Sequence, residues 1–285
     1  MIQLSGMDRI RKWTLILLST LVITTLLAQE QVAINEIEGT GNFLEMDWGR
    51  TYYEVYGEGK PLLILHGNGG SAKSKRHMVE QFAEDRMVIA MDSRCHGKST
   101  CPDEDLDYFN MAEDVFNLME HLGYEKYSIW GHSDGGILGL ILGYSHTDKI
   151  ERMVLSGANA YLEGLEPEIV SIMSNYEKIQ NPTMQKHIKL MYDQRPILLD
   201  DLKRVSVPVL LMVGDRDAVQ LEHTLALFKT LPMAQLCILP GTTHFIENEK
   251  KEQLVFWINE FQKPFSQPST VEIAKQMATS LFADH

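Results

Sequence analysis

Positive charge is scarce in this sequence, and so is cysteine. Lys and Arg together number 26 against 39 Asp and Glu, so the 285-residue chain carries a formal net charge of -13 and has no basic cluster. A protein that binds a phosphate backbone usually presents a basic face, so we expect no nucleic-acid partner. Three scattered cysteines do not make a disulfide scaffold or a zinc site, and the histidines lack paired metal-ligand spacing. We therefore expect neither a metal nor a cofactor.

The first 28 residues are predicted to lie outside the folded domain. Three basic residues between positions 9 and 12 precede an apolar stretch at 14–28, after which the chain turns polar. This pattern is typical of a secretory signal, with Ala28 as the last residue before cleavage. Leu26 is larger than a signal peptidase prefers, so an uncleaved N-terminal anchor and a buried helix stay open as alternatives. We expect an exported protein, periplasmic or secreted, whose residues 1–28 are a signal peptide or an anchor.

Apolar runs alternate with helical patterns over most of the remaining chain. The runs at 62–65 and 87–91 are continuous, which fits strands buried on both faces of a parallel sheet. Strands are predicted at 43–56 (two, with a turn at 48–50), 62–65, 87–91, before Gly131, and at 150–155, 208–213 and 235–239. Helices are predicted at 108–122, after Gly135, and at 221–230 and 246–261. This alternation predicts an α/β fold with a mostly parallel central sheet, whose core comprises residues 29–157 and 206–263.

The alternation stops between residues 158 and 205. This segment has a helical pattern and no strand, and an insertion at the carboxyl edge of such a sheet would lie over the pocket. We expect a helical cap, with an ordinary pair of surface helices as the alternative. Its Met173, Met184 and Met191 could line the pocket or pack in a core. Residues 264–285 form a C-terminal tail that is weakly amphipathic at 271–282.

A glycine-flanked serine stands between an apolar run and a helical run. Gly131-His132-Ser133-Asp134-Gly135 is a G-x-S-x-G pattern, in which the serine occupies a sharp turn from strand to helix. The two glycines lack the Cβ atoms that would collide there. The hydroxyl is then exposed at a helix N-terminus, where developing negative charge is stabilised. Ser133 as an ordinary helix N-cap is the alternative.

A second glycine-rich segment follows the predicted strand at 62–65. From Gly67 it departs by one residue, Ala72, from the phosphate-binding pattern G-x-x-x-x-G-K-[ST]. The other interpretation is an oxyanion loop, His66-Gly67-Asn68-Gly69-Gly70, whose backbone N–H at Asn68 points at a carbonyl oxygen. The presence of a G-x-S-x-G further along the chain favours the oxyanion loop.

Taken in order, these motifs resemble those of the α/β-hydrolase fold family, of the small-cap serine esterase and peptidase type. The resemblance runs from about residue 43 to 262 and includes Asp92-x-Arg94-x-His96-Gly97-x-Ser99, Gly214-Asp215-x-Asp217 and His244. It implies a nucleophile at Ser133, an acid at Asp217 rather than Asp215, and a base at His244. The backbone N–H groups of Asn68 and Asp134 would form the oxyanion hole. The family usually has glycine where this chain has Cys95.

The resemblance implies a serine hydrolase that cleaves a small ester, thioester or amide through an acyl-enzyme. Epoxide hydrolases and dehalogenases of this fold use an aspartate nucleophile, so Ser133 argues against those activities. Carbon–carbon bond hydrolysis, perhydrolysis and a non-catalytic ligand-binding role remain alternatives. The expected partner is a small-molecule substrate, and the sequence does not indicate an oligomeric state.

Several other side chains near these motifs have open roles. The Asp134 carboxylate could attract an ammonium group of the substrate, or it could turn away and bond to the loop. His66, His96 and His132 are expected to make structural hydrogen bonds. Cys237 is expected to be a buried apolar residue in its strand. In an oxidising compartment Cys95 and Cys101 could form a disulfide, although closeness in sequence does not guarantee the geometry.

Overall fold

The computed structural model describes residues 39–264 and 269–282. The predicted signal or anchor segment at 1–28 and part of the tail lie outside the described residues. Within the described residues, no helix is both long enough and apolar enough to cross a membrane.

The centre of the described fold is one eight-stranded sheet. Its strands are β1 (Thr40–Met46), β2 (Gly49–Tyr56), β3 (Lys60–Leu65), β4 (Arg86–Met91), β5 (Tyr127–His132), β6 (Ile150–Ser156), β7 (Val209–Gly214) and β8 (Ala234–Leu239). They lie in the order β1-β2-β4-β3-β5-β6-β7-β8. The β1–β2 and β2–β4 pairs are antiparallel, and every other neighbouring pair is parallel. The predicted α/β fold with a mostly parallel sheet is confirmed.

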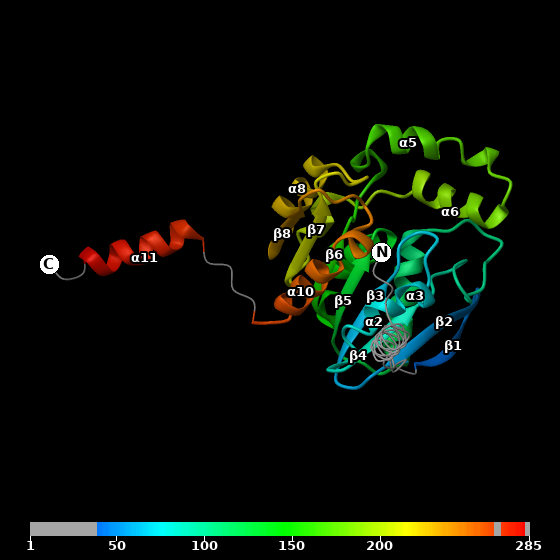
Figure 1. Ribbon diagram of the computed structural model, residues 1–285, viewed down its shortest axis with the longest axis horizontal. Helices are drawn as coiled ribbons and strands as arrows, with labels where there is room; N and C mark the ends of the chain where they lie inside the picture. The colour runs from blue at the N-terminus through cyan, green and yellow to red at the C-terminus, as the bar shows by residue number, and fades with distance from the viewer. Residues whose placement is uncertain (1–38, 265–268, 283–285) are drawn as a thin grey trace, which may run out of the picture. The chain divides into compact units, whose positions relative to one another are not determined.

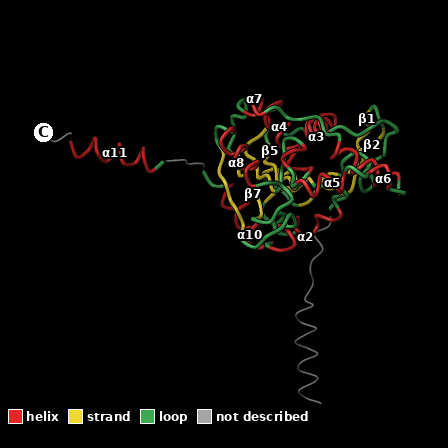
Figure 2. The backbone as a smooth tube through the Cα atoms, turned by 90° about the horizontal axis from the view of Figure 1, so that it is seen from above, coloured by secondary structure: helices red, strands yellow, loops and turns green. Residues whose placement is uncertain are grey.

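Helices cover both faces of this sheet. Helices α3 (Tyr108–His121), α4 (Asp134–Ser145) and α7 (Leu199–Leu202) lie on one side, and α2 (Arg76–Val79) and α10 (Lys251–Phe261) lie on the other (Figure 2). On the first side, Leu63 and Leu65 of β3 belong to one buried cluster with Val115 of α3 and Leu138 of α4. Burying each such side chain stabilises the fold by roughly 1.5 to 3 kcal/mol. The elements that carry the candidate site are therefore rigidly supported.

The connection between β6 and β7 is helical. It contains α5 (Pro167–Met173), α6 (Pro182–Tyr192) and α7, and Figure 1 shows α5 and α6 above the sheet. Asn181 caps α6 by accepting a hydrogen bond from the Met184 backbone N–H, and Pro182 occupies the first turn, where it needs no donor. Lys186 of α6 donates to the backbone carbonyls of Asp103 and Glu104 at 2.8 and 3.1 Å. These bonds hold α6 against the loop that follows β4.

Most element boundaries agree with the sequence prediction to within one or two residues, with three corrections. The turn between the first two strands is at 47–48 rather than 48–50, because Gly49 and Arg50 already pair with β1. Helix α2 was not predicted. The single helix predicted at 246–261 is two helices, α9 (Ile246–Glu249) and α10, because Lys250 leaves the helical conformation at φ -138 and ψ 42. The Glu249 carboxylate accepts hydrogen bonds from the N–H and hydroxyl of Thr243, so α9 is held against the preceding loop.

The last two helices to be placed are α8 (Leu221–Thr230), between β7 and β8, and α11 (Thr270–Phe282). Helix α11 falls where the sequence shows its weakly amphipathic stretch. Val271, Ile273 and Met277 on it are exposed.

Candidate active site

Ser133 lies at the turn where β5 ends and α4 begins. Its backbone has φ 54 and ψ -119, one of two positive-φ positions held by a non-glycine residue among the described residues. A Cβ atom at Gly131 would lie 2.2 Å from the Gly135 carbonyl oxygen, and one at Gly135 would lie 2.2 Å from the Leu65 carbonyl oxygen. Only glycine allows the strand and helix to approach this closely. A strained residue held by its surroundings in this way is a common feature of functional sites.

His244 connects Ser133 to Asp217. The His244 Nε2 atom lies 2.9 Å from the Ser133 Oγ atom, and the Nδ1 atom lies 2.6 Å from the Asp217 Oδ1 atom. The three residues come from the ends of β5, β7 and β8, whose carboxyl ends meet at one edge of the sheet. The Asp217 side chain is fully buried, whereas 23% of the His244 side chain is exposed. The imidazole can therefore meet a substrate while its orientation is fixed from behind.

The two aspartates near the end of β7 have different contacts. The Asp217 carboxylate also accepts hydrogen bonds from the backbone N–H of Val219 at 3.0 Å and of Gly214 at 3.3 Å. Asp215 instead accepts from the backbone N–H of Thr242 at 3.1 Å. Asp215 therefore holds the loop that carries His244, and Asp217 contacts the imidazole itself.

Two backbone N–H groups near Ser133 are free to bind an anion. Within the described residues the N–H of Asn68 has no hydrogen-bond acceptor, and neither has that of Asp134, the first residue of α4. Both residues border cavities that Ser133 also lines. The side chains of the same two residues bond to each other, since Asn68 Nδ2 lies 2.9 Å from Asp134 Oδ2. Both backbone N–H groups are therefore available as donors, and the oxyanion hole at Asn68 and Asp134 stays a prediction.

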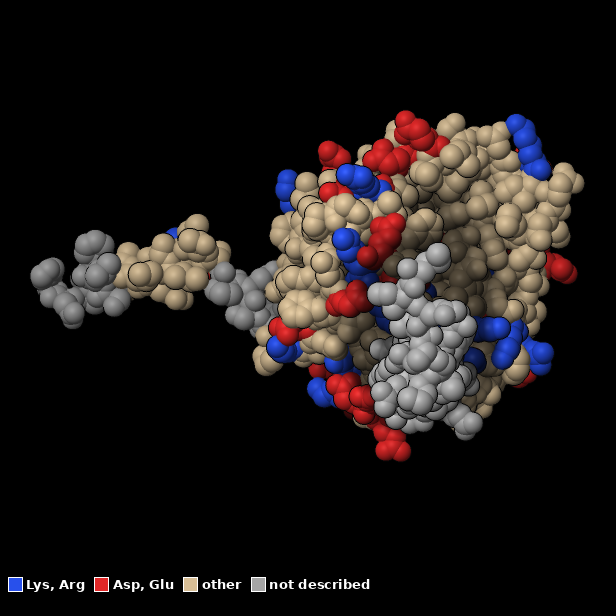
Figure 3. Space-filling view, viewed as in Figure 1, with Lys and Arg blue, Asp and Glu red and all other residues tan. Residues whose placement is uncertain are grey.

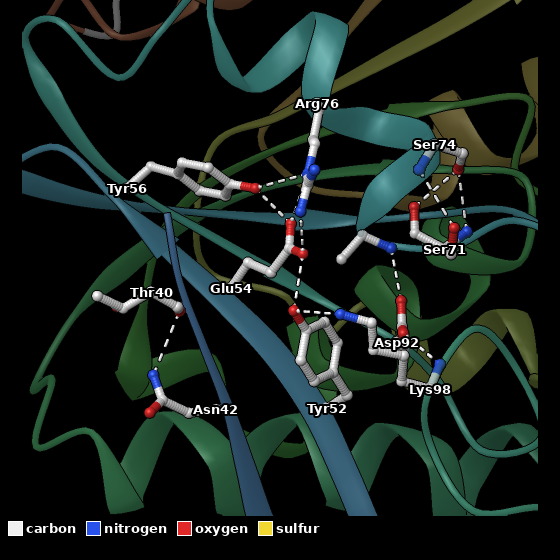
Figure 4. Close-up of polar contacts among 11 residues, drawn as sticks. Thr40, Asn42, Tyr52, Glu54, Tyr56, Ser71, Ser74, Arg76, Asp92 and Lys98 are labelled. Carbon is white, nitrogen blue, oxygen red and sulfur yellow. Dashed lines mark hydrogen bonds and ion pairs between the residues drawn. The ribbon is translucent and has the colours of Figure 1, made fainter. Parts of the chain in front are cut away.

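Buried carboxylates hold the loop that carries Asn68. Asp92 accepts hydrogen bonds from the backbone N–H of Ala72 at 2.6 Å and of Lys98 at 2.7 Å, joining the loops after β3 and β4 (Figure 4). Glu54 of β2 accepts from Arg76 at the start of α2 at 2.7 Å and from the hydroxyls of Tyr52 and Tyr56. Burial raises the pKa of Glu54, but the bonds from Arg76, Tyr56 and Tyr52 outweigh it and leave that pKa lowered.

Two cavities meet at Ser133 and His244. The first, of about 350 Å³, is lined by the Asn68 loop, by Lys75 and by the α9 residues Glu247 and Asn248. The second, of about 190 Å³, lies between the core and the α5–α6 segment, and its walls include Leu165, Ile169, Met173 and Met191. Met191 borders both cavities, whereas the Met184 side chain is 55% exposed and belongs to neither. Of the three methionines considered from sequence, two therefore face the site.

The buried histidines around the site stay neutral. Burial, and next the charge of His96, lowers the pKa of His66 to about 3. Burial, followed by the charges of Lys75 and His244, also lowers the pKa of His132 well below its ordinary value. His66 accepts from the Ser93 backbone N–H at 3.1 Å, and His132 Nδ1 lies 3.2 Å from Ser156 Oγ. Their contacts are structural, in line with the sequence interpretation.

Cys95 occupies the position where a glycine was expected from the resemblance. Its φ of 65 lies in the left-handed region that favours glycine. A disulfide joins Cys95 to Cys101, which was an open possibility from sequence. The Cys95 carbonyl lies 3.0 Å from His187 Nε2 of α6. The third cysteine, Cys237, is only partly buried in β8, because β8 is an edge strand, so the expectation of a buried residue was wrong.

The structure also brings together residues that no motif pointed to. Tyr108, Asn159 and Gln194 line the smaller cavity beside Asp134, although they come from α3, from the loop after β6 and from the segment after α6. At the larger cavity, the Nζ atom of the buried Lys75 lies 2.5 Å from the Oε2 atom of Glu247. Because these residues are far apart in the sequence, only the fold reveals that they are neighbours. Among the described residues no cluster of His, Cys, Asp and Glu is arranged to hold a metal ion.

Charge is unevenly distributed on the face shown in Figure 3. Asp and Glu gather along its upper edge around α5 and α8, while Lys and Arg occur there in separate small groups. The acidic excess of the composition is thus visible near the helical segment that covers the smaller cavity.

The sequence is similar to proteins of known families. The pattern of the family described as "alpha/beta hydrolase fold" matches residues 60–189. A soluble epoxide hydrolase of Corynebacterium sp. (strain C12) is 38% identical over 106 residues, 37% of this chain and 37% of that protein. The serine hydrolase BPHL of Homo sapiens is 29% identical over 222 residues, 68% of this chain and 76% of that protein. The matched region thus spans little more than a third of the first of these relatives.

Solved structures share the fold at low sequence identity. The crystal structure of MGS-M2, an alpha/beta hydrolase enzyme from a Medee basin deep-sea metagenome library, has a TM-score of 0.73 and 19% identity. The match covers 80% of this chain and 100% of that one. With the eight-stranded sheet and the serine at its strand-to-helix turn, these similarities show that the chain has the α/β-hydrolase fold.

Proposed function

We propose that this protein is a serine hydrolase that cleaves a small ester, thioester or amide. The observation that carries the proposal is the continuous hydrogen-bonded line from Ser133 Oγ through His244 to Asp217, at 2.9 and 2.6 Å. A serine hydroxyl is a poor nucleophile at neutral pH until a neighbouring base removes its proton. Here the base, and the carboxylate that orients it, are both within hydrogen-bonding distance.

The reaction follows from this geometry. His244 Nε2 takes the hydroxyl proton as Ser133 Oγ attacks the substrate carbonyl, and Asp217 stabilises the imidazolium that forms. The free N–H groups of Asn68 and Asp134 donate to the oxyanion, and losing one such donor costs about 3 to 4 kcal/mol. His244 then protonates the leaving group, so that the acyl group stays on Ser133. A water molecule deprotonated by His244 attacks the acyl-enzyme, which releases the acid and regenerates the serine.

The cavities support a small substrate. One side of the scissile bond enters the larger cavity near Lys75 and Glu247, and the other enters the smaller cavity under α5 and α6. The smaller cavity, of about 190 Å³, has room for a short group and none for a long acyl chain. An epoxide hydrolase activity, as in one relative's name, is disfavoured because Ser133 replaces the aspartate nucleophile that such enzymes use.

A fluorophosphonate probe tests the proposal. We expect the wild type to be labelled on Ser133 and to hydrolyse short chromogenic esters, and we expect Ser133→Ala to lose both properties while it remains folded. Labelling that persists in Ser133→Ala, or a wild type that neither reacts with the probe nor turns over any ester, thioester or aminoacyl amide, would contradict the proposal. The second result would favour a ligand-binding role.

A further inference from the structure

A solvent-exposed aromatic ring borders the larger cavity beside the candidate catalytic residues. Phe245 directly follows His244, is 62% exposed, and lines this cavity together with Ser133. The centroid of its ring lies 6.3 Å from that of the His244 imidazole. Single exposed apolar residues are common on protein surfaces, so the position of the residue matters. Phe256 on α10 is 54% exposed but borders neither cavity at Ser133, whereas Phe245 presents its apolar surface at the proposed reaction centre.

The backbone that carries the Phe245 ring is held in place on both sides. The Phe245 carbonyl accepts hydrogen bonds from the backbone N–H groups of Asn248 at 3.0 Å and Glu249 at 3.1 Å. Ile246, the next residue, is fully buried, and His244 before it is fixed by its own hydrogen bonds. A ring on a fixed backbone loses little further freedom when a ligand packs against it, so the surface is preorganised for binding.

A second apolar side chain, from a different element, borders the same cavity. Met191 of α6 lines it, whereas Phe245 lies just before α9. A thioether sulfur makes favourable contacts with aromatic rings, and so does a phenylalanine ring. An aromatic ring that enters this cavity therefore meets two side chains that favour it over a saturated ring.

The charges that line the larger cavity are paired with each other. Apart from its histidines, the charged residues lining it within the described chain are Lys75 and Glu247, and they form an ion pair. The cavity thus offers no unpaired charge to a charged substrate group, whose loss of water would stay uncompensated. An uncharged ring does not incur that cost. The cavity volume of about 350 Å³ is in the range of small-molecule sites.

We propose that the larger cavity binds an uncharged aromatic ring of the substrate and that Phe245 determines this specificity by packing against that ring. The proposal rests on the proposed serine hydrolase function and adds the substrate class: an ester, thioester or amide with an aryl group near the scissile bond on one side and a small group on the other. Aromatic pairs are favoured beyond their buried area. A saturated ring with the same carbon atoms is at least as apolar, so burial alone would not select the aryl group.

Matched pairs of esters test this specificity. We compare 2-phenylethyl with 2-cyclohexylethyl acetate, and methyl 3-phenylpropanoate with methyl 3-cyclohexylpropanoate, by pH-stat titration of the released acid. The members of each pair have equal numbers of non-hydrogen atoms, and a methylene chain separates the ring from the ester group. We expect kcat/KM to favour the phenyl compound by about two- to tenfold in one pair. Equal values, or a preference for the cyclohexyl compound, in both pairs would overturn the proposal.

Three substitutions identify the side chain responsible. Phe245→Leu removes the ring but keeps an apolar side chain, so the phenyl preference should vanish through a higher KM for the phenyl ester. Phe245→Tyr keeps the ring and should retain the preference, and Phe256→Leu is the control outside the cavity. A phenyl preference that survives in Phe245→Leu would overturn the assignment. Equal losses for both esters would also overturn it, because they would show that Phe245 acts by positioning His244.

Binding separates this proposal from the proposed hydrolysis. In Ser133→Ala, ligand-observed NMR measures the affinity of the same four esters without turnover. Tighter binding of a phenyl ester than of its cyclohexyl partner, lost in the Ser133→Ala, Phe245→Leu double variant, supports the aryl site even if the wild type hydrolyses no ester. Phenyl esters that bind no more tightly than their partners in either pair would overturn the aryl site even if hydrolysis at Ser133 is established.

Discussion

Asp217 and Asp215 are two carboxylates, two positions apart, with different tasks in the proposed mechanism. Only Asp217 contacts the His244 imidazole, and Asp215 bonds to the Thr242 backbone N–H. We predict that Asp217→Asn lowers kcat by about 10³- to 10⁴-fold, because an amide favours the wrong tautomer of His244. Asp215→Asn keeps an acceptor for Thr242, so its loss should stay below about tenfold. Steady-state kinetics on one short ester compare the two variants, and a larger loss in Asp215→Asn would show that the acid is misassigned.

The Asp134 carboxylate is predicted to favour substrates with an ammonium group next to the scissile carbonyl. It borders the smaller cavity, and Asn68 holds one of its oxygens. The 4-nitrophenyl esters of alanine and of 2-methylpropanoic acid differ only in that the first has an ammonium group where the second has a methyl group. We expect the ratio of their kcat/KM values, alanine over 2-methylpropanoate, to fall in Asp134→Asn. The variant keeps the backbone N–H of residue 134, which is part of the proposed oxyanion hole.

The pH dependence of that ratio has a definite sign. Burial raises the pKa of Asp134, although Asn68 and Tyr108 partly offset the effect. A carboxyl group with a raised pKa loses its charge at a higher pH than usual, so the preference should decline on mild acidification in the wild type. It should stay flat in Asp134→Asn. A ratio that is equal in both proteins at every pH would leave Asp134 with a structural role only.

Helix α6 is held over the site by contacts to the loop after β4, which the Cys95–Cys101 disulfide closes. His187 contacts the Cys95 carbonyl, its own carbonyl accepts from Asn68, and Lys186 binds the carbonyls of Asp103 and Glu104. Opening the bridge should lower the free energy of unfolding by about 2 kcal/mol. We predict that Cys101→Ser raises KM more than it lowers kcat, because α6 carries Met191 and contacts the Asn68 loop.

The third cysteine supplies the control for this prediction. Cys237→Ser changes a half-buried thiol on β8, away from the bridge, and should leave KM unchanged. Reducing agent should lower the melting temperature and raise the KM of the wild type and of Cys237→Ser, as the Cys101→Ser substitution does. It should have no further effect on Cys101→Ser. A wild type whose melting temperature and KM do not respond to reduction would show that the bridge does not support α6.

The Glu54 network on β2 should make the fold sensitive to acid. Because the pKa of Glu54 is lowered in the folded protein, its contribution is present above the ordinary glutamate pKa and is lost as the pH falls through the lowered one. We predict that Glu54→Gln costs about 2 kcal/mol at neutral pH, since Arg76 is 51% exposed and can be rehydrated. Urea unfolding at several pH values should show the difference from wild type shrinking toward acid. The exposed Glu45→Gln is the control, and a difference that is independent of pH would contradict the prediction.

The sequence predicted the elements that have a strong local signal. The continuous apolar runs at 62–65 and 87–91 located β3 and β4 within two residues, because strands buried on both faces contain few polar residues. Helix α2 has only four residues, and Arg76 at its start bonds to Glu54 of β2. Next to the break at Lys250, Glu249 bonds to Thr243. Neither tertiary contact has a signature in the local sequence.

The same distinction applies to the candidate site. Ser133, Asp217, His244 and the Asn68 loop were found because each belongs to a motif with a fixed place at the carboxyl edge of the sheet. Gln194 and Asn159 belong to no motif, and their contact across 35 positions exists only in the folded chain. The positions of these side chains at one edge of the sheet could therefore be predicted from sequence, whereas the shape and polarity of the neighbouring cavities could not.

The molecule as a whole is proposed to act through an acyl group carried on Ser133, and trapping that group tests the proposal most directly. The measurement is rapid mixing with a short 4-nitrophenyl ester, followed by acid quenching and peptide mass spectrometry. We predict a burst of nitrophenolate close to one equivalent and an acyl adduct on the peptide that contains Ser133, with neither in Ser133→Ala. Turnover without any adduct at Ser133, or an adduct of equal yield on another residue in Ser133→Ala, would contradict the account.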